Sequence, residues 1–289
     1  MINTAAVTVE PSAATLGASV DGIDLNQPLG PHLINTITDL WAQHLVLVFR
    51  EQTMDEAGLL QFARALGDLD PPGPNPYRKG PVYPEFPELN VISNIVEGGE
   101  PIGNLGDGEA VWHADMTYQD VPPKGAILQA VELPPAGGNT QFANMYAAYD
   151  ALDGDLRRAI NGKVAIHDAS HNSAGILRRG YEPITDVRDT PGARQPLVRT
   201  DQESGRRCLF LGRRPRSYVL GMEVAESDTL LDSLWAHATQ PEFVYTHEWH
   251  AGDVLMWDNL ALLHRRDAFA PDTRRRLHRA QLRGQGTVL

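Results

Sequence analysis

The sequence predicts a mainly β protein with flanking helices, folded as a double-stranded β-helix, or jelly roll. Short strand-like runs recur along the chain, and glycine- and proline-rich turns separate them. Helical patterns are few, and no G-x-G-x-x-G follows a strand as it does in doubly wound α/β folds. Because β folds of 289 residues commonly share one core, we expect a single domain over residues 1–289.

The first third of the chain predicts strands and two helices. Residues 15–25 alternate as a strand does, and a helix over about 31–44 precedes a short apolar strand at 45–49. A second helix is expected over about 54–66, where Thr53 and Glu56 match a capping box and Gly67 ends the helical pattern. Residues 70–90 are rich in proline and aromatic residues, which predicts a long ordered loop.

The remaining elements complete the jelly roll. Helices are predicted at about 144–161 and 223–239, the second with an apolar face. Further strands are predicted at 90–95, 126–132, 207–211, 254–257 and 277–282. We therefore expect a β core with the helices packed outside it.

The composition argues against several classes of protein. A formal net charge of −12 does not suit general nucleic-acid binding, which needs a basic footprint. No run approaches the roughly 18 apolar residues of a membrane span, and residues 1–17 lack the features of an export signal. Cys208 is the only cysteine, so an intrachain disulfide is excluded, and a cytoplasmic location is expected.

The strongest local signal is the sequence Trp-His-Ala-Asp at 112–115. On an extended strand, His113 and Asp115 point to the same face and can converge on one ion. An imidazole and a carboxylate are two of the three ligands in the facial triad that leaves positions open on non-haem iron. Taken alone the pattern is weak, because salt bridges and turns produce it too.

The third ligand must come from a distant strand, and the chain has ten histidines. His264 ends an apolar run at 253–264, a position that by itself favours a structural histidine. The residues that follow favour a ligand, because Arg275 and Arg279 share one face of a strand over 274–282. Inward guanidinium groups need an anion, and a dicarboxylate suits them because guanidinium binds carboxylates in a bidentate manner.

Five motifs in this order closely resemble those of the taurine and aryloxyalkanoate dioxygenase family: WHAD (112–115), GGNTQF (137–142), GDVLMWDN (252–259), LLHR (262–265) and RRRLHR (274–279). The resemblance covers nearly the whole chain and implies a dioxygenase that uses iron(II), 2-oxoglutarate and O2. It implies that the iron ligands are His113, Asp115 and His264. It also implies that Thr140 and Arg275 bind the distal carboxylate of 2-oxoglutarate, with Arg279 beside the iron-bound carboxylate.

The same resemblance implies hydroxylation of a small organic molecule, with release of succinate and CO2. Candidate substrate-binding residues are Tyr77, Met116, Arg213 and Arg279. We expect a small anion other than taurine, because Pro72 stands where the taurine enzymes have a histidine that grips the sulfonate. A homo-oligomer is also expected.

Two other functions stay open at this point. A metal-dependent hydrolase or lyase on a cupin-like barrel would leave Thr140 and Arg275 without a common purpose. A non-enzymatic, ligand-binding jelly roll would be expected to lack one of the triad residues, and all three are present. The histidines of His247-Glu248-Trp249-His250 do not have the H-E-x-x-H spacing of a zinc site, so structural roles are favoured for them.

Overall fold

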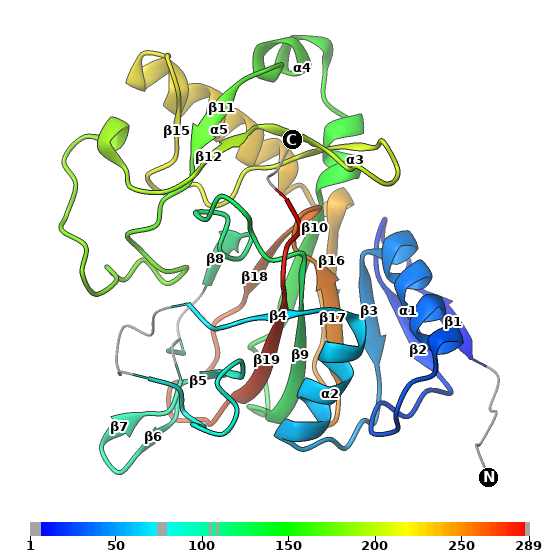
Figure 1. The fold of residues 1–289 in the computed structure, drawn as a ribbon. Coiled ribbons are helices and arrows are strands. Elements are labelled where there is room, and N and C mark those ends of the chain that lie inside the picture. The colour runs from blue at the N-terminus through cyan, green and yellow to red at the C-terminus, as the bar shows by residue number, and fades with distance from the viewer. Residues whose placement is uncertain (1–6, 74–79, 104–105, 108–109, 287–289) are drawn as a thin grey trace.

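The computed structural model describes residues 7–73, 80–103, 106–107 and 110–286 (Figure 1). Two antiparallel-rich sheets form its centre. The larger has the order β1 (Thr8–Pro11), β2 (Ala18–Asp21), β3 (Val46–Phe49), β17 (Val254–Asp258), β9 (Gly125–Glu132), β19 (Arg276–Leu282), β4 (Leu69–Asp70), with β5 (Asn90–Ser93) also paired to β19. The smaller has the order β16 (Val244–His247), β10 (Thr140–Asn144), β18 (Leu262–Arg266), β8 (Ala110–His113).

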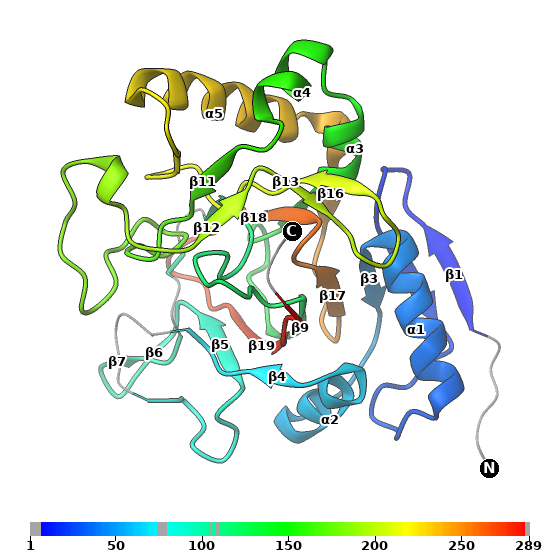
Figure 2. The same ribbon diagram turned by 45° about the horizontal axis from the view of Figure 1, so that its top comes forward.

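The helices and minor strands surround these sheets. The helices are α1 (Pro31–His44), α2 (Glu56–Leu66), α3 (Met145–Asp150), α4 (Gly154–Ile160) and α5 (Val224–Ala238), with short 3-10 helices at Val187–Asp189 and Pro241–Phe243. One minor sheet has the order β12 (Arg194–Pro196), β11 (Val164–Ile166), β15 (Tyr218–Val219). Two further pairs of strands are β13 (Val198–Thr200) with β14 (Arg207–Leu209) and β6 (Val96–Glu97) with β7 (Glu100–Pro101). Figure 2 shows α3, α4 and α5 gathered at one end of the β core. No helix of the described chain is long and apolar enough to cross a membrane.

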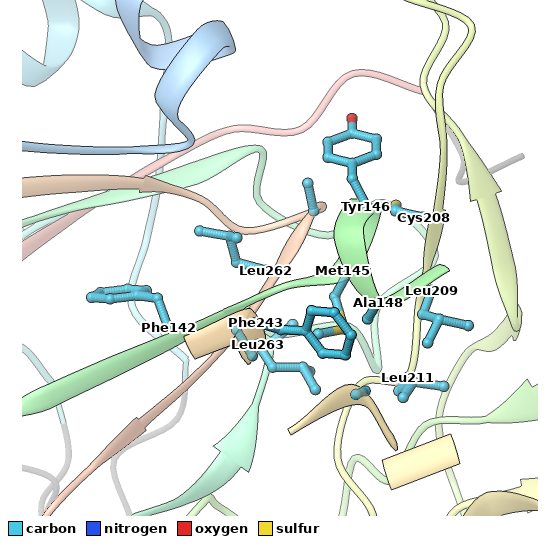
Figure 3. Packing of buried hydrophobic residues seen from close by; sticks show 14 of the residues in the cluster. Phe142, Met145, Tyr146, Ala148, Cys208, Leu209, Leu211, Phe243, Leu262 and Leu263 are labelled. Carbon is cyan, nitrogen blue, oxygen red and sulfur yellow. The ribbon is translucent and has the colours of Figure 1, made fainter. Parts of the chain in front are cut away.

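The larger sheet buries both of its faces, which explains why β3 reads as an unbroken apolar run. Val46 and Val48 pack with residues of the smaller sheet, whereas Leu47 and Phe49 pack under α1 and α2. Figure 3 shows part of the apolar cluster that contains Val46 and Val48. In it, Phe142 of β10 is grouped with side chains from β14 and β18. Burial of apolar surface on both faces therefore holds the two sheets and their helices together.

Most predicted elements are confirmed, and the differences have local causes. The capping box was wrong, because α2 begins at Glu56 with Asp55 as its N-cap, whose carboxylate accepts a hydrogen bond from the Gly58 amide. The single helix predicted over 144–161 is two helices, since Asp153 caps a new helix after the end of α3. Strands that were not predicted include β1, β10 and β16 and most of the minor strands. The proposed single domain stays a prediction.

The connection between β17 and β18 decides where the site lies. These strands belong to different sheets, so the chain crosses from one sheet to the other at residues 258–261. The Asp258 carboxylate accepts hydrogen bonds from the amides of Leu260 and Ala261, which fixes the crossing. The turn that begins at Asp258 therefore places β18 in the interior of the smaller sheet, between β10 and β8.

Candidate active site

Three side chains with metal-binding chemistry meet on the smaller sheet. β8 and β18 are antiparallel neighbours that place His113 directly opposite His264, and Asp115 follows two residues after His113. One ligand atom from each residue lies within 4.8 Å of the others, the only such group of three in the described chain. The Nε2 atoms of His113 and His264 lie 3.7 and 3.9 Å from the Asp115 carboxylate.

Asp115 reaches this position by a route that differs from the prediction. Strand β8 ends at His113, so the two residues do not share a strand face; the chain turns at Asp115, and Met116 adopts a positive φ of 51°. Asn259, which is fully buried, holds this turn. Its side-chain oxygen accepts from the Asp115 amide at 2.7 Å, and its side-chain nitrogen donates to the Asp115 carbonyl at 2.9 Å and the Pro123 carbonyl at 3.0 Å.

The protonation states of the three residues suit a divalent cation. The Nδ1 atom of His113 donates to the Val111 carbonyl at 2.7 Å, which leaves the Nε2 lone pair directed at the site. Burial lowers the pKa of both histidines, that of His264 to about 3, so both imidazoles are neutral. Burial opposes ionisation of Asp115, but Arg279 and the two histidines outweigh it and lower that pKa to about 2.

Arg279 faces the site, as the strand pattern predicts, but it already has an anionic partner. Its Nη1 atom lies 2.8 Å from the Asp115 carboxylate. We expected an anion from outside the protein to bind this guanidinium. For the Nη1 donor that expectation was wrong, because Asp115 already accepts its hydrogen bond. The pair instead holds one oxygen of Asp115 and orients that carboxylate toward the two histidines.

Arg275 is a buried cation with no carboxylate partner in the part of the chain that the structure describes. It is only 2% exposed, its Nη2 atom donates to the Gly138 carbonyl at 3.1 Å, and its Nε atom has no partner among the described residues. Burial, reinforced by nearby Arg266, lowers the pKa of Arg275 to about 9. Gly138 is necessary here, because a Cβ on it would lie 3.0 Å from the Arg275 Nε atom at a backbone φ of +69°.

The neighbours of Arg275 confirm the predicted strand register. Arg274 donates to the Glu132 carboxylate at 2.6 Å, and Arg276 lies 3.7 Å from the same group. These two residues therefore face away from the cavity that Arg275 enters. Since an isolated buried charge is costly, the pocket around Arg275 suits a bound anion.

Thr140, at the start of β10, lines the same cavity and is 5% exposed. The Trp249 indole Nε1 atom donates to the Thr140 Oγ1 atom at 3.0 Å. Because an indole N–H can only donate, the hydroxyl hydrogen of Thr140 remains available for a ligand oxygen. Sequence reasoning missed both Trp249 and Asn259; the signal for Asn259 was its place in the GDVLMWDN motif, whereas nothing local marked Trp249.

One cavity of about 130 Å³ joins these groups. The triad, Thr140, Arg275 and Arg279 line it, and so do Met116 and Arg213, two of the predicted substrate residues. Arg213 already forms an ion pair within the protein, because its Nη2 atom lies 3.1 Å from the Asp168 carboxylate. Tyr77, the remaining predicted substrate residue, lies outside the described residues.

The model of the taurine catabolism dioxygenase TauD, TfdA family matches residues 8–281. The chain belongs to this family. It is 38% identical over 282 residues to an alpha-ketoglutarate-dependent 2,4-dichlorophenoxyacetate dioxygenase from Cupriavidus pinatubonensis, with 95% of this chain and 96% of the relative covered. It is 33% identical to an (S)-phenoxypropionate/alpha-ketoglutarate dioxygenase from Sphingobium herbicidovorans, with coverage of 90% and 88%.

A solved structure agrees with this family membership. The structure of AAD-2 in complex with Mn(II) and N-oxalylglycine has a TM-score of 0.80 and 30% identity, and the match covers 99% of this chain and all of that one. The predicted jelly roll and reaction class are confirmed. The protein is an oxidoreductase that uses iron(II), 2-oxoglutarate and O2, and the hydrolase and non-enzymatic alternatives find no support.

Proposed function

We propose that this dioxygenase hydroxylates a small carboxylic acid, with His113, Asp115 and His264 as the iron ligands and Arg275 with Thr140 as the 2-oxoglutarate site. One observation carries the proposal: a neutral-histidine, ionised-aspartate triad shares a cavity with a buried guanidinium that has no carboxylate among the described residues. When bound, iron(II), 2-oxoglutarate and O2 supply the oxidising chemistry, and succinate and CO2 are released.

The residues present fit both groups. Two imidazoles and one carboxylate are the donor set that leaves positions open on non-haem iron for further ligands. Arg275 and Thr140 offer a guanidinium and a hydroxyl hydrogen, which match the distal carboxylate of a dicarboxylic acid. Placing a carboxylate beside Arg275 would also compensate its buried charge.

The protein's own part in the reaction is orientation and exclusion of water. Arg279 holds one oxygen of Asp115, and Asn259 holds the backbone of that residue. Leu128 and Trp257 form an apolar part of the cavity wall and are 7% and 1% exposed. A fixed site with apolar side chains in its wall keeps the reacting groups at constant geometry, which is the main contribution of a protein scaffold to such chemistry.

The cationic cavity and the relatives support the substrate class. The two relatives described above are named for aryloxyalkanoic acids, 2,4-dichlorophenoxyacetate and (S)-phenoxypropionate. We propose an acid of that kind as the substrate here, and Pro72 remains the reason to expect little activity with taurine. The predicted homo-oligomer and cytoplasmic location stay predictions.

Anaerobic absorbance tests the metal and 2-oxoglutarate assignments. Adding 2-oxoglutarate to the iron(II)-loaded protein should produce a weak visible charge-transfer band. The band should disappear in His113→Ala, Asp115→Ala and His264→Ala. His250→Ala is the matched control, because that imidazole is largely exposed and belongs to another cluster. A normal band in the triad variants, or its loss only in His250→Ala, would show that the assignment is wrong.

Succinate formation tests the substrate class. We expect turnover with 2,4-dichlorophenoxyacetate or (S)-phenoxypropionate, little with the primary amides of these acids, and little with taurine. A preference for the amides, or efficient turnover of taurine, would contradict the proposed class while leaving the iron and 2-oxoglutarate sites intact.

A further inference from the structure

The arginines that line the cavity differ in whether a carboxylate of the protein neutralises their charge. Arg279 is paired with Asp115 at 2.8 Å, and Arg213 is paired with Asp168 at 3.1 Å. Arg275 is the one assigned to 2-oxoglutarate. Arg178 also lines the cavity, and among the described residues it has no carboxylate at salt-bridge distance.

The contacts of Arg178 hold the residue without neutralising it. Its guanidinium carbon lies 4.1 Å from the centroid of the Tyr118 ring, and its Nη1 atom donates to the Ala169 carbonyl at 3.3 Å. Its backbone amide donates to the Ser170 carbonyl at 2.7 Å, which ties the segment to the protein. Burial raises the pKa of Tyr118, so the ring beneath the guanidinium is a neutral phenol. None of these partners carries a negative charge.

Stacking on an aromatic face leaves the edge of a guanidinium free. Arg178 uses one N–H on Ala169, and its five donors in a planar fork allow a further bidentate contact with a carboxylate. The residue is half-buried, whereas Asp115 and His264 are buried, so Arg178 lies toward the open side of the cavity. Tyr118 connects the two regions, since it comes three residues after Asp115 and lines the same wall.

We propose that Arg178, stacked on Tyr118, binds the carboxylate of the primary substrate at the outer part of the cavity and is the specificity-determining cation of this enzyme. The inference rests on the proposed function, because it concerns the acid that the iron centre oxidises. Arg279 then serves Asp115 and the 2-oxoglutarate side, and it is not the main anchor of the substrate.

Charge explains why the substrate carboxylate would bind Arg178 and not Arg213 or Arg279. A carboxylate placed at Arg213 would have to compete with Asp168, which is fully buried at its side chain and already accepts from that guanidinium. A carboxylate at Arg279 would meet the negative charge of Asp115. At Arg178 it meets a cation with no such competitor in the described chain, and the Tyr118 ring offers an apolar surface beside it.

The test uses Arg178→Gln and Arg178→Lys, with Arg179→Gln as the matched control. Arg179 is the next residue along the chain, carries the same charge and is exposed. Each variant is loaded with Mn(II) and N-oxalylglycine, and the dissociation constants of 2,4-dichlorophenoxyacetate and (S)-phenoxypropionate are measured by calorimetry. In parallel, KM and kcat for the same acids and their amides are obtained from succinate formation with iron(II).

In Arg178→Gln we expect the acids to bind about 10- to 100-fold more weakly, the loss typical of a hydrogen-bonded charge. KM should rise by a similar factor, with kcat changed less, and the preference for acid over amide should fall. The dissociation constants and KM of Arg178→Lys should lie between those of the wild type and Arg178→Gln, because an ammonium keeps the charge but loses the bidentate fork. Arg179→Gln should match the wild type.

The outcomes separate this inference from the function on which it rests. Affinity for 2-oxoglutarate and the visible band should be unchanged in every variant. If the acids are turned over and Arg178→Gln keeps the wild-type KM and dissociation constants, the inference is wrong and the proposed function stands. If neither acid binds or is oxidised by the wild type, the proposed substrate class fails, and this inference fails with it.

Discussion

Replacing Arg275 by glutamine should have two opposite effects, one on the free protein and one on its complex. In the free protein, the substitution removes a charged group that is 2% exposed and has no carboxylate partner in the described chain. In the complex, it removes the proposed anchor of the distal carboxylate of 2-oxoglutarate. A residue with a merely structural role would show a loss of stability and no specific loss of affinity.

The sizes of both effects follow from the burial of Arg275. Its pKa falls from 12.5 to about 9, which at about 1.4 kcal/mol per pH unit means that the charged form is disfavoured by several kcal/mol. Relief of this desolvation cost should raise the midpoint temperature of ligand-free Arg275→Gln by several degrees, since replacing buried ionic groups is often neutral or stabilising by up to about 4 kcal/mol. Removing one partner of a buried charge pair costs about 2–5 kcal/mol in binding, which predicts roughly 30-fold to several thousand-fold weaker 2-oxoglutarate.

Thermal unfolding with and without Mn(II) and 2-oxoglutarate measures both effects in one assay. The wild type should gain stability from 2-oxoglutarate, whereas Arg275→Gln should be more stable without it and gain little from it. Arg274→Gln is the control, because its guanidinium is exposed and bonded to Glu132 on the opposite face. Equal losses of affinity in both variants would refute the strand register, and a destabilised free protein with unchanged affinity would refute the anion-binding role.

Three further predictions follow from the same contacts. Asn259→Ala should weaken Mn(II) binding and lower stability by about 3–5 kcal/mol in urea unfolding, since the Asp115 backbone loses two buried hydrogen bonds and the Pro123 carbonyl loses one; unchanged metal affinity would contradict this. Trp249→Phe should weaken 2-oxoglutarate by about 3- to 10-fold by calorimetry, but have no effect in a Thr140→Val background, because the indole acts through the Thr140 hydroxyl. His167 has a pKa lowered to about 3 by burial and Arg213, so the unfolded state binds the extra proton below pH 6.5 and acid destabilises the fold; the stability lost between pH 7 and pH 5 should be about 2 kcal/mol smaller in His167→Asn.

The sequence by itself determined the β class, the order of most elements and the chemistry of the site. Strand periodicity was sufficient to place Arg279 on the cavity face of β19 and Arg276 on the other face, because side chains alternate every residue in a strand. The same alternation extends to Arg275 and Arg274, which directly precede β19. The motifs were sufficient to group the three triad residues, since family motifs carry information about distant contacts that local patterns lack.

Only the tertiary structure decided which charges are already compensated. Asp115 leaves the strand and turns toward Arg279, and Asp168 lies against Arg213, although 164 and 45 residues separate these partners in the chain. Local propensity cannot encode such contacts, because they depend on how two sheets and a distant loop pack together. Arg275 and Arg178 line the cavity with no carboxylate at salt-bridge distance in the described residues, and that difference from Arg279 and Arg213 directs both the 2-oxoglutarate and the substrate assignments.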